Sequence, residues 1–221
     1  MQVKNADFKN NYPQKELLLK FLVIGEFGVG KTAIVRRYTE GKFSSNYKIT
    51  IGADFAIKSI LWDSDTRINL QLWDIAGHER FGYMTRVYYK YAVGACVVFD
   101  LSRVATLYAV DKWVSDLREK ICLPNDQPVP IILLANKSDI QGCSIPSDAI
   151  AKICKDNGIA AWYITSAKDN SNIEQAFNHL MEIAMENEQT SYENKPDKNG
   201  IILKDNNKGV VSNNLKPNCC N

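Results

Sequence analysis

Hydrophobic residues along this chain fall into short runs that alternate with stretches of helical spacing. Some runs are continuous and have the length of buried strands, while others alternate apolar with polar residues in the two-residue period of strands. These patterns predict strands at residues 17–24, 55–62, 68–73, 95–99, 131–135 and 162–165. Apolar residues three or four positions apart predict helices instead. The helical stretches are residues 31–38, 106–121, 147–157 and 173–185. Ser147 is expected to cap the third of these helices.

Strands that alternate with helices imply an α/β fold, in which a mostly parallel sheet is covered on both faces. Residues 17–185 carry this alternation and form the expected domain. Residues 1–16 are polar and predict a flexible lead. Residues 186–221 are rich in Asn and poor in aliphatic residues, so they cannot bury enough surface to fold. They predict a disordered tail.

The composition argues against several classes of protein. Lys and Arg number 27 against 25 Asp and Glu, and a net charge of +2 argues against a nucleic-acid-binding surface. No apolar run approaches the roughly 18 residues of a membrane-spanning helix. The charged N-terminus lacks the apolar segment of a signal peptide, so secretion is not expected. The six Cys show no zinc-binding spacing, and a reducing cytosol is the expected setting.

The clearest chemical signal is G-E-F-G-V-G-K-T, which follows a predicted strand and opens a predicted helix. It fits the phosphate-binding pattern G-x-x-x-x-G-K-[ST]. Its glycines let successive backbone N–H groups point at phosphate oxygens, and the helix N-terminus adds partial positive charge. Lys31 is expected to reach the β- and γ-phosphates, and Thr32 to bind Mg²⁺. The nucleotide-binding residues expected here are Gly25, Glu26, Phe27, Gly28, Val29, Gly30, Lys31, Thr32 and Ala33.

A second signal, N-K-S-D at residues 136–139, directly follows the predicted strand at 131–135. A carboxylate can accept hydrogen bonds from both N1–H and the 2-amino group of guanine. Because adenine lacks both donors on that edge, Asp139 would select GTP over ATP. Lys137 can lie along the base, and Asn136 can join this loop to the phosphate loop. Alone, N-K-S-D is better explained as a solvated loop, but its place downstream of a phosphate loop favours base recognition. The residues expected to place backbone donors near the base carbonyl are Ser166, Ala167 and Lys168.

A third signal, D-I-A-G, ends the predicted strand at 68–73 and begins with Asp74. Asp74 can hold Mg²⁺ through water, and the Gly77 N–H can reach a γ-phosphate. Thr50 lies between the first helix and the second strand, where it could complete the metal shell only while a γ-phosphate is present. Without the other motifs, Thr50 would be an ordinary β-branched residue entering a strand. The expected metal-binding residues are Thr32, Thr50 and Asp74.

With the phosphate loop, D-I-A-G, N-K-S-D and residues 166–168 in this order along the chain, residues 17–185 resemble a small GTPase of the Ras superfamily and, within it, the Rab family. The Rab resemblance is carried by I-G-A-D-F at 51–55, L-Q-L-W-D at 70–74, E-R-F at 79–81 and Y-Y-K-Y-A at 88–92. Ile75, together with L-P-N at 123–125 and Pro128, resembles the Rab subgroup that serves lysosome-related organelles.

The resemblance implies a six-stranded sheet with five flanking helices, bound Mg²⁺ with GTP or GDP, and two switch segments at about residues 41–52 and 76–84. It implies that Phe43 contacts the guanine edge-on, and that the γ-phosphate orders both switches through Thr50 and Gly77. The effector-binding residues that it implies are Ile49, Ile51, Gly52, Ala53, Asp54, Phe55, Trp73, Phe81 and Tyr89. For Trp73, core packing and partner surface are equally good explanations. The implied partners are a guanine nucleotide exchange factor, a GTPase-activating protein, a GDP-dissociation inhibitor, the prenylation machinery and effector proteins.

The chain ends in Cys219, Cys220 and Asn221, which do not form a C-a-a-X box. The resemblance implies geranylgeranyl groups on both Cys, and two prenyl chains suffice for stable anchoring where one is marginal. The alternative is two solvated thiols. The expected location is the cytoplasmic face of endosomes or lysosome-related organelles, with cycling through the cytosol.

Two positions depart from the family pattern. Many relatives carry Gln directly after D-x-x-G to orient the attacking water, whereas this chain carries His78. Phe27 takes a phosphate-loop position that is often small, and its ring can crowd the γ-phosphate. Both features predict slow intrinsic hydrolysis. GTP binding is expected to stay tight, because the phosphate-loop residues Gly25, Gly28, Gly30, Lys31 and Thr32 are intact. The catalytic candidates are His78, Thr50 and Lys31.

The leading interpretation is a GTP-binding and GTP-hydrolysing switch for vesicle or organelle traffic, with lysosome-related organelles as its destination. The alternative is a slowly hydrolysing, largely GTP-bound membrane scaffold that recruits effectors. An unrelated phosphate-loop kinase is disfavoured, because it explains neither N-K-S-D nor D-I-A-G.

Overall fold

The computed structural model describes Pro13 and residues 15–46, 48–78, 84–123, 127–142 and 145–193. In this part of the chain the strands are β1 (Lys15–Gly25), β2 (Ala53–Leu61), β3 (Thr66–Ile75), β4 (Gly94–Asp100), β5 (Ile131–Asn136) and β6 (Ala161–Ile164). The helices are α1 (Lys31–Glu40), α2 (Met84–Tyr89), α3 (Val104–Tyr108), α4 (Val110–Lys120), α5 (Ser147–Asp156) and α6 (Ile173–Glu193). None of these helices is both long and apolar enough to cross a membrane.

The strands form one sheet in the order β2-β3-β1-β4-β5-β6. β2 runs antiparallel to β3, and all other neighbouring strands are parallel. The predicted six-stranded, mostly parallel α/β fold is therefore confirmed. β4 and β5 are buried along their whole length, as expected for central strands with helices on both faces.

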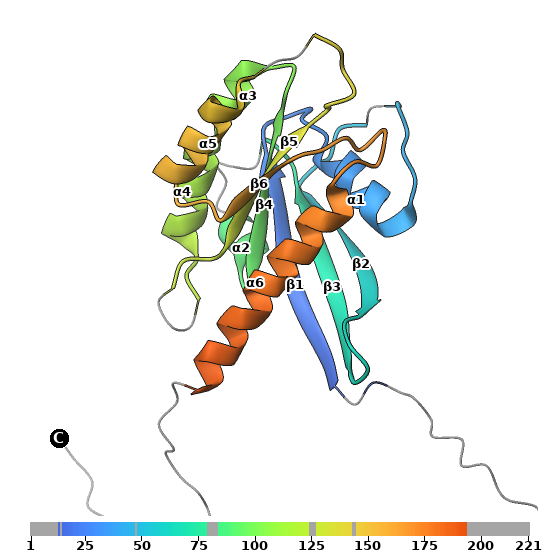
Figure 1. Ribbon diagram of the computed structural model, residues 1–221, viewed down its shortest axis with the longest axis vertical. Coiled ribbons are helices and arrows are strands. Elements are labelled where there is room, and N and C mark those ends of the chain that lie inside the picture. Colours follow the sequence, from blue (N-terminus) through green and yellow to red (C-terminus); the bar gives the residue numbers. More distant parts are fainter. Residues whose placement is uncertain are drawn as a thin grey trace, which may run out of the picture.

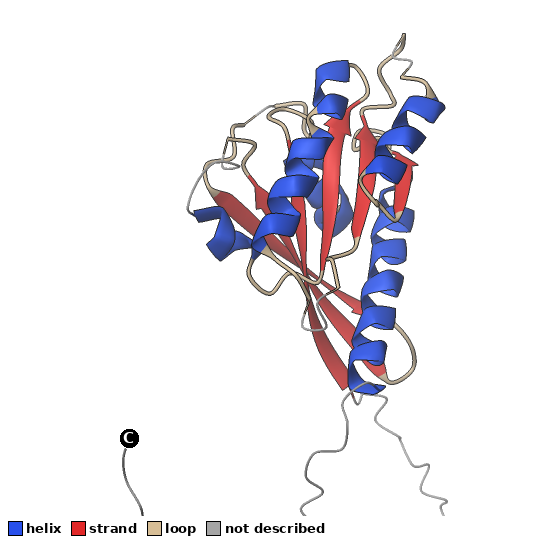
Figure 2. Cartoon of the chain, turned by 90° about the vertical axis from the view of Figure 1, so that its left-hand side faces the viewer, coloured by secondary structure: helices blue, strands red, loops and turns tan. Residues whose placement is uncertain are grey.

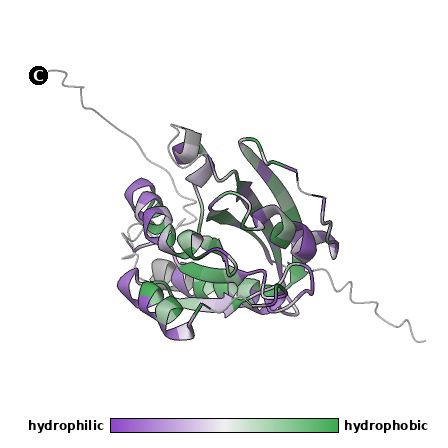
Figure 3. Ribbon diagram, turned by 90° about the horizontal axis from the view of Figure 1, so that it is seen from above, coloured by the Kyte–Doolittle hydropathy of each residue, from purple (hydrophilic) through white to green (hydrophobic). Residues whose placement is uncertain are grey.

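Two helical layers cover the sheet (Figure 1). α1 and α6 pack on one face, where Ile34 and Phe177 are fully buried in the core. Helices α2 to α5 lie over the other face, where Trp113 of α4 is buried against β1, β4 and β5. Viewed from above, the hydrophobic residues lie between the layers and the hydrophilic ones on the outer helix faces (Figure 3). The periodic apolar positions thus form two cores, one on each side of the sheet.

Some helix boundaries differ from the prediction. The expected helix at 106–121 begins earlier and is divided at Ala109 into α3 and α4. The five flanking helices that the resemblance implies therefore appear as six separate helices in the described residues. Ser147 is the first residue of α5 and not its cap, so that expectation was wrong. Pro146 takes the cap position with an extended backbone, and its carbonyl accepts the N–H groups of Ala149 and Ile150. α6 continues to Glu193, past the expected end at residue 185.

Because five strands are parallel, their carboxyl ends meet at one edge of the sheet. The predicted phosphate loop follows β1, D-I-A-G spans the end of β3, and N-K-S-D overlaps the end of β5. β1 starts and α6 ends at the opposite end of the domain (Figures 1 and 2). The fold therefore collects the candidate functional loops at one end and the chain termini of the domain at the other.

Candidate functional site

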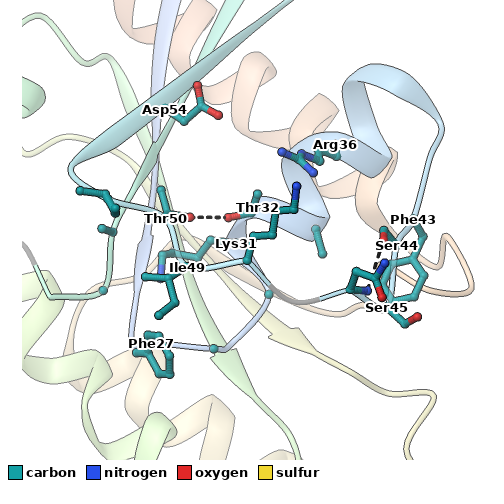
Figure 4. Close-up of a pocket in the computed structure, with 18 of the residues that line it drawn as sticks. Phe27, Lys31, Thr32, Arg36, Phe43, Ser44, Ser45, Ile49, Thr50 and Asp54 are labelled. Carbon is teal, nitrogen blue, oxygen red and sulfur yellow. Dashed lines mark hydrogen bonds between the residues drawn. The ribbon is translucent and has the colours of Figure 1, made fainter.

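A cleft of about 580 Å³ opens at the carboxyl edge of the sheet. It is lined by the phosphate loop, the start of α1, the segment around residues 42–51, and Gly77 and Lys137. Figure 4 shows Lys31 and Thr32 at the start of α1 beside Thr50, with Phe43 farther along the cleft. The cleft thus joins the expected phosphate and metal residues to the residue expected at the base.

The phosphate loop is shaped by its last glycine. Gly30 has a φ of +100°, a conformation that side chains rarely adopt, and an added Cβ would collide with Asn136 Nδ2. Gly30 is the N-cap residue of α1, and no side chain caps that helix. The first-turn N–H groups of α1 are therefore available to an anion, which the helix dipole also favours.

Lys31 is buried at the floor of the cleft. Its ammonium donates to the carbonyls of Gly25 at 2.8 Å and Glu26 at 2.9 Å, which fixes it under the loop. Burial lowers its pKa to about 8, although the charges of Asp74 and Glu26 oppose that change. The Glu26 carboxylate accepts a hydrogen bond from Trp113 Nε1 at 3.1 Å, and Val29 is fully buried. Their roles at a phosphate would therefore fall to their backbone N–H groups.

The three expected metal-binding residues converge. The Thr32 hydroxyl lies 2.5 Å from Asp74 Oδ2 and 2.9 Å from the Thr50 hydroxyl (Figure 4), and Thr50 lies 3.4 Å from the same carboxylate oxygen. Burial raises the pKa of Asp74 and outweighs the hydrogen bonds from the two threonines. The other oxygen, Asp74 Oδ1, is buried without a hydrogen-bond partner.

This arrangement fits Mg²⁺. The ion prefers oxygen ligands and is often held by one or two carboxylates together with substrate phosphates. Two hydroxyls and one carboxylate supply the protein's share, and the unpartnered oxygen of Asp74 is the kind of group that a cation or its water satisfies. The described residues contain no cluster of three or more His, Cys, Asp or Glu that could bind a metal without a ligand's oxygens.

Gly77 lies directly against the phosphate loop. A Cβ on this residue would sit 2.5 Å from the backbone nitrogen of Phe27, so any side chain would displace the loop. The D-x-x-G segment and the phosphate loop consequently share one backbone surface, where the Gly77 N–H was expected to meet a γ-phosphate.

The residues expected at the base are held together from two loops. Asn136 Nδ2 donates to the Val29 carbonyl at 2.8 Å, which is the expected connection to the phosphate loop, and its Oδ1 accepts the Ala167 N–H at 3.3 Å. Asp139 Oδ1 accepts the Ser166 hydroxyl at 2.7 Å, and Lys168 lies 3.8 Å from Oδ2. The Asp139 carboxylate is therefore oriented before any base is present.

Lys137 sits at the turn of this loop with a φ of +69°. Its ammonium lies 2.8 Å from Asp100, a buried carboxylate at the end of β4. No motif indicated Asp100, although a charged residue at the carboxyl end of a buried parallel strand is a recognisable signal. Arg103, which contacts both Asp100 and the Phe27 carbonyl, also belongs to no motif and could not be predicted from the sequence pattern.

Arg37 is a third residue that the motifs did not reveal. From α1 it donates to the carbonyls of Ala167 and Lys168, at 2.7 and 2.9 Å, and to that of Gly41 at 2.7 Å. The Phe43 ring lies 6.0 Å from its guanidinium. Arg37 thus connects the base loop to the start of the exposed segment that carries Phe43.

The two residues that depart from the family pattern touch each other. The rings of Phe27 and His78 have centroids 5.0 Å apart and are inclined by 34°. Both side chains are exposed at the end of the cleft beside Gly77. His78 is therefore held against the phosphate loop by an aromatic contact that glutamine could not make in the same way.

Aromatic residues also form a surface outside the cleft. Phe55 stacks on Trp73 with ring centroids 5.9 Å apart, and Trp73 lies 6.4 Å from Tyr88. Ile49, Ile51 and Asp54 are exposed, and Gly52 and Ala53 are half-buried.

Tyr89 is a correction to the expected effector set, because its side chain is fully buried and its hydroxyl donates to Asp116 at 3.0 Å. Phe81, Cys219 and Cys220 lie outside the described residues.

Comparison with known proteins agrees with this geometry. A family model described as "Ras family" matches residues 20–186. Ras-related protein Rab-32 of Homo sapiens is 56% identical over 187 residues, which cover 83% of each chain. Rab-32A of Dictyostelium discoideum is 47% identical over 208 residues, covering 93% of this chain and 94% of the relative. Human Rab-7L1 is 44% identical over 173 residues, covering 78% of this chain and 85% of the relative.

A phosphate loop, a threonine–aspartate corner and a base-reading loop around one cleft define a nucleotide-binding protein of the small GTPase class. The chain belongs to the Ras family and, within it, to the Rab small GTPases, the GTP-binding switches of membrane traffic. The expected family is thereby confirmed, and the Rab-32 and Rab-7L1 relatives support the expected subgroup.

Proposed function

We propose that this protein is a GTP-hydrolysing switch that regulates membrane traffic of lysosome-related organelles. The proposal rests on one observation: the base loop and the Thr32–Thr50–Asp74 group are connected through the phosphate loop along one cleft. Asn136 ties the base loop to the phosphate loop, and the phosphate loop leads directly into the Thr32–Thr50–Asp74 corner. A guanine nucleotide with Mg²⁺ would place its base at the base loop and its γ-phosphate and metal ion at the Thr32–Thr50–Asp74 group.

In this proposal each residue has a stated role. Asp139 accepts hydrogen bonds from the guanine edge, Phe43 contacts the base, and Ser166 orients the Asp139 carboxylate. Lys31 and the loop N–H groups bind phosphates. Thr32, Thr50 and Asp74 hold Mg²⁺, which would neutralise charge on the transferred phosphoryl group. Since Thr50 lies in the exposed segment before β2, contact with a γ-phosphate-bound ion would couple nucleotide state to that segment.

Purified protein tests this function directly. We expect GTP and GDP to bind at least about 10⁴-fold more tightly than ATP, because adenine lacks the donors that Asp139 accepts. Competition binding measures this ratio, and single-turnover hydrolysis with Mg²⁺ measures the reaction. ATP binding comparable to GTP binding would contradict the assignment of residues 136–139.

Effector proteins would distinguish the GTP-bound form from the GDP-bound form by contact with an aromatic cluster and the segment before β2. Phe55, Trp73 and Tyr88 form the aromatic cluster, and Ile49 and Ile51 are exposed in the segment before β2, which together would suit effector proteins. An exchange factor, an activating protein and a GDP-dissociation inhibitor complete the proposed cycle. The test is capture of these partners from lysate by GTP-loaded and GDP-loaded protein, and equal capture by the two forms would contradict a switch.

We further propose that both terminal cysteines are prenylated. Cys219 and Cys220 are adjacent, and two chains give stable membrane binding where one does not. The C-terminal helix α6 ends at the opposite end of the domain from the loops after the parallel strands, so the chain toward the proposed anchor leaves the domain away from the candidate nucleotide site (Figure 2). Mass spectrometry of the C-terminal peptide from a membrane fraction checks this. Unmodified Cys219 and Cys220 in that fraction would disprove it.

Slow hydrolysis is a second proposal, favoured by the contact between Phe27 and His78. With a γ-phosphate bound, the phenyl ring would occupy space that the attacking water needs, and the ring contact holds the imidazole against it. We expect single-turnover hydrolysis to accelerate in His78→Gln, and more in the variant that also carries Phe27→Ser. Purified wild-type protein would then contain mostly GTP, as the scaffold alternative requires. If neither variant is faster than wild type, these two positions do not limit the rate.

A further inference from the structure

An arginine outside every recognised motif connects the base side of the cleft to the phosphate loop. Arg103, in the turn between β4 and α3, donates from Nε to Asp100 Oδ2 at 2.9 Å. Its Nη2 donates to the backbone carbonyl of Phe27 in the phosphate loop, also at 2.9 Å. One guanidinium therefore connects the end of β4 to a phosphate-loop residue that lies 76 positions before Arg103 in the chain.

The anchor of this bridge is a buried carboxylate. Asp100 is 1% exposed and also accepts the Lys137 ammonium at 2.8 Å and the Ser102 N–H at 2.9 Å. Burial alone would raise the pKa of Asp100, but hydrogen bonds from Lys137, Ser102 and Arg103 outweigh it and leave that pKa below its usual value. Asp100 is therefore a fixed negative charge that holds Arg103 and the base-loop Lys137 together.

At its other end the bridge reaches the phosphate loop where the loop turns. A Cβ on Gly28 would lie 3.6 Å from Arg103 Nη2, so the guanidinium lies against this turn. Two residues after Phe27, the Val29 carbonyl accepts a hydrogen bond from the Asn136 side chain. The carbonyls of Phe27 and Val29 are thus both tied to the base side of the cleft, one by Arg103 and one by Asn136.

We infer that Arg103 is a positioning residue for nucleotide retention, which holds the phosphate loop in register with the base-reading loop through Asp100. The inference rests on the proposed guanine-nucleotide function. A planar guanidinium donates in two fixed directions at once, whereas a lysine ammonium at the end of a flexible stem cannot reproduce that fork. Loss of the bridge would let the two loops move independently, and the nucleotide that both loops hold would leave faster.

The test compares the release of a fluorescent GDP analogue from wild type, Arg103→Ala, Arg103→Lys and Arg118→Ala. Arg118 is the matched control, because its guanidinium also donates to a backbone carbonyl, that of Gly158 between α5 and β6, and neither residue lines the cleft. We expect Arg103→Ala to release the analogue roughly tenfold faster, since a hydrogen bond to a charged group and one to the loop are lost together. Arg118→Ala should match wild type.

Arg103→Lys separates a directed bridge from simple charge. If the bridge positions the loop, Arg103→Lys should release the analogue at a rate closer to that of Arg103→Ala than to wild type. A rate closer to wild type would show that positive charge suffices and would overturn the inference. Release from Arg103→Ala no faster than from the control would overturn it as well, while leaving the guanine-nucleotide function intact. A wild-type protein that retains no guanine nucleotide contradicts the proposed function itself.

Discussion

The side chains predicted at the base, except Phe43, are fixed by hydrogen bonds within the protein, whereas most of the segment that leads to Thr50 at the γ-phosphate end is exposed. Hydrogen bonds join Asn136 to the phosphate loop and to Ala167, and join Ser166 to Asp139. In contrast, every described residue from Gly41 to Ile51 is exposed except Thr50, and Ile51 is 90% exposed. The hydroxyl of Thr50 connects this segment to Thr32 and Asp74.

The difference follows from what each end must do. Recognition of a base benefits from groups that are already oriented, because binding then has little ordering entropy to overcome. A switch needs the opposite, since a ligand can only shift a segment whose two states differ little in free energy without it. A segment anchored through a half-buried threonine can respond to a γ-phosphate. The predictions below disturb the two ends separately, in order of decreasing expected effect.

Asp139→Asn should abolish recognition at the preorganised end. Asparagine offers a donor where the guanine amino group needs an acceptor, and xanthine offers an acceptor there instead. We expect the preference for GTP over XTP to reverse, with a combined change of roughly 10⁴-fold. Competition binding measures it, and Asp169→Asn, an exposed carboxylate in the neighbouring loop, is the control. An unchanged preference would remove Asp139 from the base site.

Thr32→Asn should weaken the metal corner where it meets the switch segment. The Thr32 hydroxyl contacts both Thr50 and Asp74, so its loss disturbs all three proposed metal-binding groups. We expect GTP affinity in Mg²⁺ to fall about 10- to 100-fold, with a smaller loss for GDP. Titration calorimetry checks this against Thr39→Asn, a threonine of the same helix whose hydroxyl donates to the Val35 carbonyl. Equal GTP affinity in wild type and Thr32→Asn would exclude Thr32 as a ligand.

Ser166→Ala should loosen the base end without removing its carboxylate. The hydroxyl donates to Asp139 at 2.7 Å, and hydrogen bonds to charged groups contribute about 1.5–3 kcal/mol. We therefore expect GDP and GTP affinity to fall together by roughly tenfold. Ser59→Ala removes a hydroxyl that donates to Asn69 on the exposed β2–β3 pair and should have no effect on binding. A loss confined to GTP would show that the base end is not preorganised as described.

Thr50→Val should produce the smallest and most selective change. Valine keeps the shape and removes only the hydroxyl, which is one neutral hydrogen-bonding group worth about 1 kcal/mol. We expect GTP affinity to fall about fivefold with GDP affinity unchanged, and Thr50→Ser should behave as wild type. Parallel titrations with both nucleotides give the answer. An equal loss of affinity for GDP and GTP would mean that the Thr50 hydroxyl does not respond to the γ-phosphate.

The fold could be predicted from the sequence because its strands and helices are encoded by local patterns. Continuous apolar runs predicted β1, β4 and β5, and helical spacing predicted α4 and α6. Helix ends were less predictable. The division at Ala109 and the backbone cap at Pro146 depend on geometry that one residue's identity does not decide.

The site was predictable where a motif occupies adjacent positions. The residues of the phosphate loop and those of N-K-S-D are neighbours in the chain, so the spacing of each motif is visible in the sequence. Tyr88 and Tyr89 show the limit of that approach. They are neighbours of the same type, yet one is half-buried beside Trp73 and the other is fully buried and donates to Asp116. Only the packing of α2 on α4 decides which one a partner could reach.

The sequence by itself determined the class of this protein, because the order of strands, helices and short motifs is a local property of the chain. The tertiary structure decided how distant residues meet. Arg103 joins Asp100 to the phosphate loop, Arg37 joins α1 to the base loop, and Phe27 meets His78. These contacts depend on the parallel register of β1, β3, β4 and β5, which brings loops far apart in sequence to one edge of the sheet. No periodicity within a single segment carries that information.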